Sequence, residues 1–132
     1  MANAIYPKAK EQMLQGGLDM SSGTVKMALI DLGTYTYNAS HEFFDDISGV
    51  VGTPVEITPK TFTNGIFDSS SDVVFSSVTG DTVEALVIYI DTGNPATSRL
   101  IAFLDTNQSG LPVTPNGGDI TFSPNASGIF QL

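Results

Sequence analysis

The sequence TVEALVIYIDTGNPATSRLIAFLD, residues 82–105, carries the strongest structural pattern in the chain. It holds two apolar runs, residues 85–90 and 100–104, separated by a polar turn that contains Gly93 and Pro95. Short runs that are rich in β-branched and aromatic residues, with turn formers at both ends, predict paired strands rather than helices. Both faces of the first run are apolar, so we expect this hairpin at the centre of a packed sheet.

Further strand signals lie on both sides of this hairpin. Residues 24–31 alternate in hydrophobicity, residues 50–58 alternate more weakly, and residues 72–78, 120–122 and 128–132 form short apolar runs. Pro54 places its strand at a sheet edge, because proline has no N–H to donate. Asn64-Gly65 predicts a hairpin turn. About eight short strands separated by frequent turns are typical of a sandwich or jelly roll.

Two short helices are also predicted. Pro7 suits the first turn of a helix of about ten residues, and Gly16 suits its end. Its apolar side is thin, with Ala9, Met13 and Leu14, so it needs a neighbour, either the domain's own sheet or another subunit. Ser40 is expected to cap a second short helix near residues 40–47, with Phe43, Phe44 and Ile47 toward the core.

These patterns define the fold class. We predict a mainly β fold, an antiparallel, jelly-roll-like β-sandwich that forms a single domain over residues 1–132. Residues 1–23 are its N-terminal arm, whose helix packs on the sheet or on a neighbour. The chain has no cysteine, so it depends on neither disulfides nor thiolate metal sites.

Charge narrows the range of partners. Fourteen acidic residues against five basic ones give a net charge of −9, and only Arg99 is basic after residue 60. Phosphate backbones and anionic membrane surfaces repel such a chain, so we expect neither direct nucleic-acid binding nor membrane binding. No apolar run approaches the ~20 residues that span a bilayer, and residues 1–12 lack a secretory core. We expect a soluble protein, whose export, if it occurs, takes another route such as cell lysis.

The sequence offers no catalytic apparatus. His41 is the only histidine, no G-x-S-x-G elbow is present, and His41 is interpreted as a surface residue in a capped first turn. Aspartates such as Asp31, Asp91 and Asp119 follow strands or begin turns, where they accept hydrogen bonds from backbone N–H groups. No phosphate-binding glycine motif occurs. The prediction is a protein that is not an enzyme and has no cofactor.

One loop resembles a calcium ligand pattern. Asp105, Asn107, Ser109 and Gly110 match positions 1, 3, 5 and 6 of an EF-hand loop, but Asn116 stands where the bidentate glutamate belongs. The flanking sequence predicts strands rather than helices. We therefore predict a polar hairpin loop at 105–119 and no metal, and leave cation binding by this loop open.

The chain resembles a group of small virion structural proteins of tailed bacteriophages. The resemblance rests on MANAIYPKAKEQMLQGGLDM, TVKMALIDLGTYTY, TNGIFD, GDTVEALVIYIDTG, TSRLIAFLD and GLPVTPNGGDITF, and it covers nearly the whole chain. Proteins of this kind are similar in size to capsid cement or decoration proteins, several of which look like small jelly rolls on the outer capsid lattice.

The resemblance implies a non-enzymatic cement or decoration protein that binds the major capsid protein and copies of itself and stabilises the head. It would be made in the host bacterial cytoplasm and located in the virion, on the capsid surface rather than the tail. A tail-associated structural or carbohydrate-binding adhesion module, with Tyr35 and Tyr37 as a platform, is the alternative. From local reading, we predict contact residues in the arm and in loop 105–119: Tyr6, Pro7, Met13, Leu14, Leu111, Pro112, Val113 and Pro115.

Overall fold

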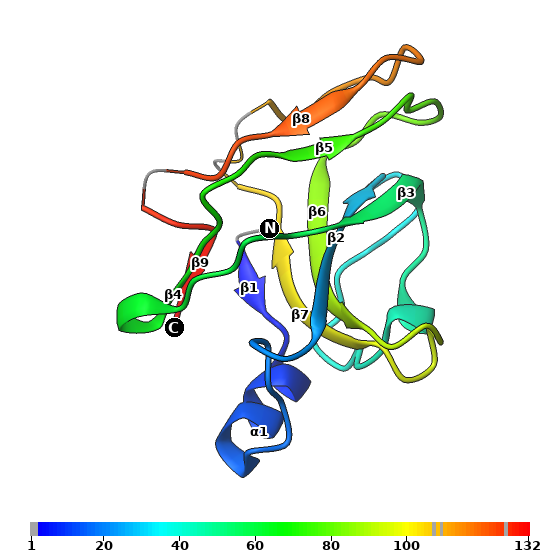
Figure 1. Ribbon diagram of the computed structural model, residues 1–132. Coiled ribbons are helices and arrows are strands. Elements are labelled where there is room, and N and C mark those ends of the chain that lie inside the picture. Colours follow the sequence, from blue (N-terminus) through cyan, green and yellow to red (C-terminus); the bar gives the residue numbers. More distant parts are fainter. Residues whose placement is uncertain (1–2, 107, 109, 126) are drawn as a thin grey trace.

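The main element of the fold is a five-stranded antiparallel sheet (Figure 1). The structure, a computed structural model, describes residues 3–106, 108, 110–125 and 127–132. The strand order is β1-β7-β6-β2-β3. Their bounds are β1 (Ala4–Ile5), β2 (Thr24–Ile30), β3 (Val50–Glu56), β6 (Ala85–Asp91) and β7 (Arg99–Leu104).

Strand β6 is the centre of the sheet, as the sequence predicts. It pairs antiparallel with β7 on one side and with β2 on the other, in registers that join Leu86 to Leu104 and to Leu29. Residues 85–89 are all buried. Pairing on both sides satisfies the backbone hydrogen-bonding groups of β6, and its two apolar faces remove surface from water on both sides of the sheet.

The edge position predicted for residues 50–58 is confirmed. Strand β3 lies last in the order of the sheet, which leaves room for Pro54. Its pairing with β2 shifts register between Met27 and Leu29. Gly52 lies in the corresponding part of β3 with φ at 71°, a conformation in which glycine avoids the steric cost of a Cβ.

Two two-stranded ribbons complete the sandwich-like arrangement. Strand β5 (Val73–Phe75) pairs with β8 (Ile120–Phe122), and β4 (Ile66–Phe67) pairs with β9 (Phe130–Gln131). In β5, residues 73 and 75 are buried while Val74 is exposed, so one face of this ribbon packs on the core. The ribbon β5–β8 and helix α1 lie at opposite ends of the view in Figure 1. The fold is mainly β, as predicted.

The first predicted helix is confirmed as α1 (Pro7–Gln15). Pro7 occupies its first turn, and Gly16 ends it in the left-handed conformation with φ at 72°. Ala9 is fully buried, while Leu14 is 90% exposed. The helix contacts β7, so the chain's own sheet supplies the neighbour that such a short helix requires.

The second predicted helix is wrong in extent and in its cap. Only one 3₁₀ turn forms, at Phe44–Asp46, and the Ser40 hydroxyl donates to Asn38 Oδ1 instead of capping it. The reason is competition for backbone groups. Leu100 N donates to Glu42 O at 3.0 Å and Phe44 N donates to Ser98 O at 2.7 Å, so Glu42 and Phe43 run beside β7 and the chain turns only from Phe44 on.

The Asn64-Gly65 turn forms, but the predicted hairpin is only partly correct. Asn64 has φ at 57° and Gly65 has φ at 75°, the positive values that a type I′ turn requires. Thr61 pairs with Asp68 across the turn. Strand β4, which follows the turn, pairs instead with β9 at the C-terminal end of the chain, a partner that local sequence does not reveal.

Candidate functional site

The outer edge of β7 is covered by two separate segments. Strand β1 pairs with it at Phe103 and Ala102, and Tyr6 N donates to Ile101 O at 2.9 Å. Residues 42–44 cover the remainder at residues 98–100. The N-terminal arm and the segment 31–49 therefore meet over β7, which is where the candidate site lies.

A chain of side-chain hydrogen bonds joins these two segments. The hydroxyl oxygens of Tyr6 and Tyr35 are 2.8 Å apart, and the Tyr35 hydroxyl oxygen is 2.8 Å from His41 Nδ1. Tyr6 is fully buried, Tyr35 is 2% exposed and His41 is half-buried. Tyr6 belongs to the arm, whereas Tyr35 and His41 belong to segment 31–49, before its 3₁₀ turn. The hydrogen bonds therefore connect two segments that are distant in sequence.

The Tyr35 hydroxyl is the middle group of this chain, because it bonds both the Tyr6 hydroxyl and His41 Nδ1. Either hydroxyl of the Tyr6–Tyr35 pair can be the donor, and the role of His41 Nδ1 depends on the tautomer of its ring. Burial raises the pKa of Tyr6 well above its ordinary value of 10.0, and the hydrogen bond to Tyr35 raises it further. Burial also raises the pKa of Tyr35, so both phenols stay neutral.

His41 is therefore not the surface residue of a capped helix that the sequence predicted. Its ring packs against Tyr35 with centroids 5.5 Å apart, and Nδ1 is used in the hydrogen bond described above. The sequence signal for these contacts was the number of aromatic residues in segment 31–49. It did not identify the partners, because no spacing rule links Tyr35 to Tyr6, which lies 29 residues away.

A pocket lies beside these hydrogen bonds, with a cavity volume of about 360 Å³. We call it the aromatic pocket, and its lining residues are Leu32, Tyr35, Thr36, Tyr37, Phe103 and Asp105. The ring of Tyr37 lies 5.2 Å from those of Phe103 and Tyr6. Tyr37 is half-buried, and burial raises its pKa. Tyr35 and Tyr37 thus lie at the edge of the core rather than on an exposed platform.

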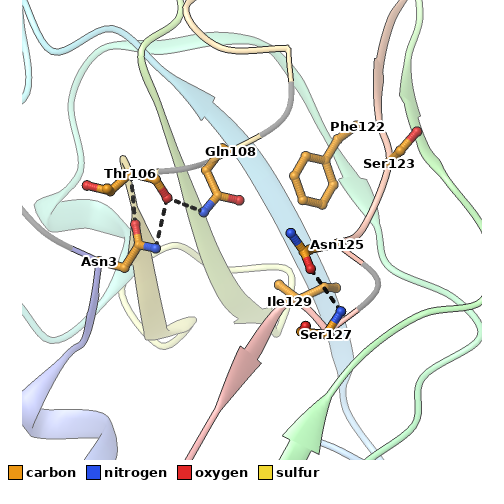
Figure 2. Close-up of a pocket in the computed structure, with 9 residues that line it drawn as sticks. Asn3, Thr106, Gln108, Phe122, Ser123, Asn125, Ser127 and Ile129 are labelled. Atoms are coloured by element: carbon orange, nitrogen blue, oxygen red, sulfur yellow. Dashed lines mark hydrogen bonds between the residues drawn. The ribbon is translucent and has the colours of Figure 1, made fainter.

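A second pocket, of about 330 Å³, is polar (Figure 2). Three amide side chains and several hydroxyls line it; its residues are Asn3, Thr106, Gln108, Phe122, Ser123, Asn125, Ser127, Gly128 and Ile129. Thr106 N donates to Asn3 Oδ1 at 2.9 Å, and the amides of Asn3 and Gln108 both donate to Thr106 O. The Asn3 side chain thereby fixes the arm to the start of loop 105–119.

The predicted contact residues of the arm fall into different environments. Pro7 and Leu14 are exposed, and Met13 is half-buried. Tyr6 is an exception that requires correction, because its side chain has no exposed surface and forms the buried hydrogen bond to Tyr35. A partner of the folded chain thus has no access to Tyr6, and its role is to anchor the arm.

The predicted contact residues of loop 105–119 are partly anchored to the body. Val83 and Val113 pair through two backbone hydrogen bonds of 2.8 and 3.0 Å. Leu111, Val113 and Pro115 are half-buried, whereas Pro112 is exposed. Their contact with a partner stays a prediction.

The calcium-like pattern falls partly outside the described residues. Asn107 and Ser109 are among the residues that the structure does not describe, so cation binding by the loop is left as an open prediction. Within the ranges that are described, no three His, Asp or Glu side chains come together as a metal site.

The basic residues are largely engaged within the chain. Lys26 Nζ lies 2.7 Å from Asp91 Oδ2, and Lys8 pairs with Glu11. Lys60 Nζ donates to the carbonyl oxygens of Met20 and Gly23. Arg99 binds Glu42 at 3.2 Å and lies over the Phe43 ring, 4.7 Å from its centroid. The surface that remains for partners is therefore strongly negative.

Comparison with known proteins does not assign the chain to a family. No protein-family model matches the chain, and no curated protein matches it. None of the helices in the described part of the chain has the length and apolar character needed to cross a membrane.

Proposed function

We propose that this chain is a non-enzymatic structural protein of a tailed-bacteriophage virion, namely a capsid cement protein. It binds the lattice of the major capsid protein, together with copies of itself, and stabilises the head. It is made in the host bacterial cytoplasm and acts on the capsid surface. The sequence resemblance over nearly the whole chain supports this proposal.

The structural observation that carries the proposal is the N-terminal helix. Helix α1 is fixed to the body by buried Tyr6 and Ala9, and it presents Leu14 to solvent with 90% of its surface exposed. A large apolar side chain held on a fixed helix offers a partner contact area at little cost in conformational entropy. Cement proteins need such a fixed contact element and no active site.

The state of His41 supports the non-enzymatic part of the proposal. It is the only histidine in the sequence, and its Nδ1 is occupied by a buried tyrosine hydroxyl. In a Ser-His-Asp arrangement, a carboxylate bonds one ring nitrogen of the histidine and stabilises the imidazolium that forms. Tyr35, with its raised pKa, is a neutral partner and does not provide the negative charge that stabilises an imidazolium.

Purified particles test the proposal directly. Quantitative mass spectrometry of phage particles, followed by reconstruction of the head, is expected to find the chain in many symmetric copies on the outer capsid surface. Absence from particles, or presence at only a few copies in each, overturns the cement function.

A variant tests the part played by α1. Particles are prepared from phage that lacks the gene and are supplied with wild-type protein, Leu14→Ala or Val74→Ala. Leu14→Ala is expected to lower the number of bound copies, while Val74→Ala, a matched change at an exposed residue of β5, is expected to have no effect. Equal occupancy by all three proteins contradicts a contact through α1.

The polar pocket favours a second candidate function, a tail-associated structural or carbohydrate-binding module. Its amides and hydroxyls are groups that hydrogen-bond sugar hydroxyls, and Figure 2 shows them arranged around one cavity. Tail localisation in the reconstruction, together with binding on a glycan array that Asn125→Ala abolishes, would favour this candidate over the first. An array without binding eliminates its carbohydrate-binding form.

A further inference from the structure

Two carboxylates lie at or near the aromatic pocket. Asp105 is one of its lining residues, and Glu84 Oε1 accepts a hydrogen bond of 3.2 Å from the backbone N–H of Leu32, another lining residue. Glu84 forms no ion pair with any residue in the described part of the chain. No lysine or arginine is among the lining residues, and the whole chain has a charge of −9. The pocket therefore lies in a negative potential.

The aromatic walls of the pocket also favour a positively charged ligand. The half-buried ring of Tyr37 lines the pocket and packs 5.2 Å from the ring of Phe103, which is only 1% exposed, so Tyr37 supplies the accessible ring surface. The face of an aromatic ring is the negative part of its quadrupole and attracts cations. Asp105 already accepts a hydrogen bond from the Thr106 hydroxyl, and its carboxylate supplements the attraction that the rings and the surrounding charge provide.

The chain contains an internal example of this chemistry. The Arg99 guanidinium lies 4.7 Å from the centroid of the Phe43 ring while Nη1 contacts Glu42 Oε1 at 3.2 Å. An aromatic face and a carboxylate thus hold a guanidinium on this same protein. The aromatic pocket also brings an aromatic ring and a carboxylate together, at Tyr37 and Asp105.

We propose that the aromatic pocket binds an arginine side chain of a protein partner. A planar, weakly hydrated guanidinium stacks on an aromatic ring better than a compact ammonium does. The cavity volume of about 360 Å³ lies at the lower end of the range for ligand pockets, which suits a single side chain. This inference rests on the proposed function only for the identity of the partner, which would be a capsid subunit. The chemistry of the pocket is independent of that identity.

An NMR titration of the full chain tests the chemistry. The probes are N-acetyl-arginine amide, its neutral isostere N-acetyl-citrulline amide, and methyl glucoside. The arginine probe is expected to cause saturable shifts of the Tyr37 and Phe103 ring resonances, which weaken as salt is added. Binding of citrulline as tight as that of arginine, tighter binding of the sugar, or no saturable shift up to the solubility limit overturns the proposal.

Paired variants separate the ring face from the hydroxyl. Tyr37→Leu removes the π face and is expected to weaken arginine binding about five- to thirty-fold. Tyr37→Phe keeps the face and is expected to bind as the wild type does. Glu84→Gln is expected to bind more weakly, by an amount that shrinks with added salt. A thermal unfolding curve checks the fold of each variant, and equal affinity of Tyr37→Leu and Tyr37→Phe contradicts the role of the ring.

Particle occupancy distinguishes the two proposals. Arginine binding by a chain that is absent from capsids overturns the cement function and leaves the pocket proposal standing. Abundant chain on capsids without arginine binding overturns only the pocket. When both hold, Tyr37→Leu is expected to occupy fewer capsid positions than Tyr37→Phe, and equal occupancy contradicts a capsid subunit as the source of the arginine.

Discussion

The β6–β7 hairpin and the covering of the outer β7 edge are held by different forces. The hairpin buries every side chain between residues 85 and 89, in a pattern visible along one short piece of sequence. The covering consists of the N-terminal arm and segment 31–49, which meet through the hydrogen bond from Tyr6 to Tyr35 and the ring contact of Tyr6 with Tyr37. The hairpin thus depends on apolar area, whereas the covering depends also on the geometry of a few hydrogen bonds.

The largest expected effect tests the hairpin. Ile88 is fully buried at the centre of β6, and a carboxylate there costs several kcal/mol, against a typical free energy of unfolding of about 5–15 kcal/mol. Ile88→Asp is expected to abolish folding, as judged by circular dichroism and chemical denaturation. Val74→Asp, at a position that is 42% exposed, is the control and is expected to fold. Soluble Ile88→Asp protein that unfolds cooperatively would show that the hairpin tolerates a buried charge.

The next effect tests the covering. Tyr35→Phe leaves the buried Tyr6 hydroxyl without its hydrogen-bond partner, so we expect the free energy of unfolding to fall by about 1–3 kcal/mol. In Tyr6→Phe the Tyr35 hydroxyl keeps His41 Nδ1 as a partner, and a loss of about 0.5–1.5 kcal/mol is expected. In the double variant the loss is expected to be smaller than the sum, because both changes remove the same hydrogen bond. Additive losses in urea denaturation would show that the two hydroxyls do not interact.

This contrast also explains how far the sequence predicts the structure. The strands and α1 were predictable because their signals are local: alternating apolar residues for β2, two-sided apolar runs for β6, and Pro7 with Gly16 at the ends of the helix. The covering was not, because its contacts have no periodicity. The Ser40 cap signal was present, but hydrogen bonding of residues 42–44 to the β7 edge outcompeted it.

The same reasoning applies to the candidate site. Tyr35 and Tyr37 were recognised as aromatic residues of interest, but the aromatic pocket also needs Phe103, which comes from β7. The partner of β4 was missed for a similar reason, since β9 lies at the other end of the sequence. Local turn chemistry at Asn64-Gly65 was correct, whereas the pairing beyond the turn depended on distant residues.

A smaller effect concerns a polar contact on the hairpin itself. The hydrogen bond from Lys26, followed by that from the Gly93 backbone, lowers the pKa of Asp91 below its ordinary value of 3.8. The carboxylate therefore stabilises the fold above pH 3.8, and this contribution is lost as the pH falls through the lowered pKa. Asp91→Asn is expected to lower the free energy of unfolding at pH 7 by up to about 1 kcal/mol, because the pair is partly exposed.

The pH dependence provides the check on Asp91. The difference in the free energy of unfolding between wild type and Asp91→Asn is expected to disappear in acid, as measured by urea denaturation between neutral pH and the acid limit of folding. Asp72→Asn, at an exposed residue, controls for the loss of one negative charge. A difference that persists unchanged in acid would mean that Asp91 acts through its turn hydrogen bonds rather than through its charge.

The smallest effect is expected at Leu14, on the outer side of the arm. Its side chain is 90% exposed, so Leu14→Ala removes almost no buried area, and alanine has the higher helix propensity. We expect the free energy of unfolding to change by less than about 0.5 kcal/mol, whereas Ala9→Ser, at a fully buried position of the same helix, is expected to destabilise the chain by placing a hydroxyl in the core. A large loss of stability in Leu14→Ala would show that Leu14 supports the fold itself. An unchanged stability combined with loss of capsid binding would show that Leu14 contacts a partner. The two sides of α1 would then have different roles, with Ala9 supporting the fold and Leu14 forming a contact surface.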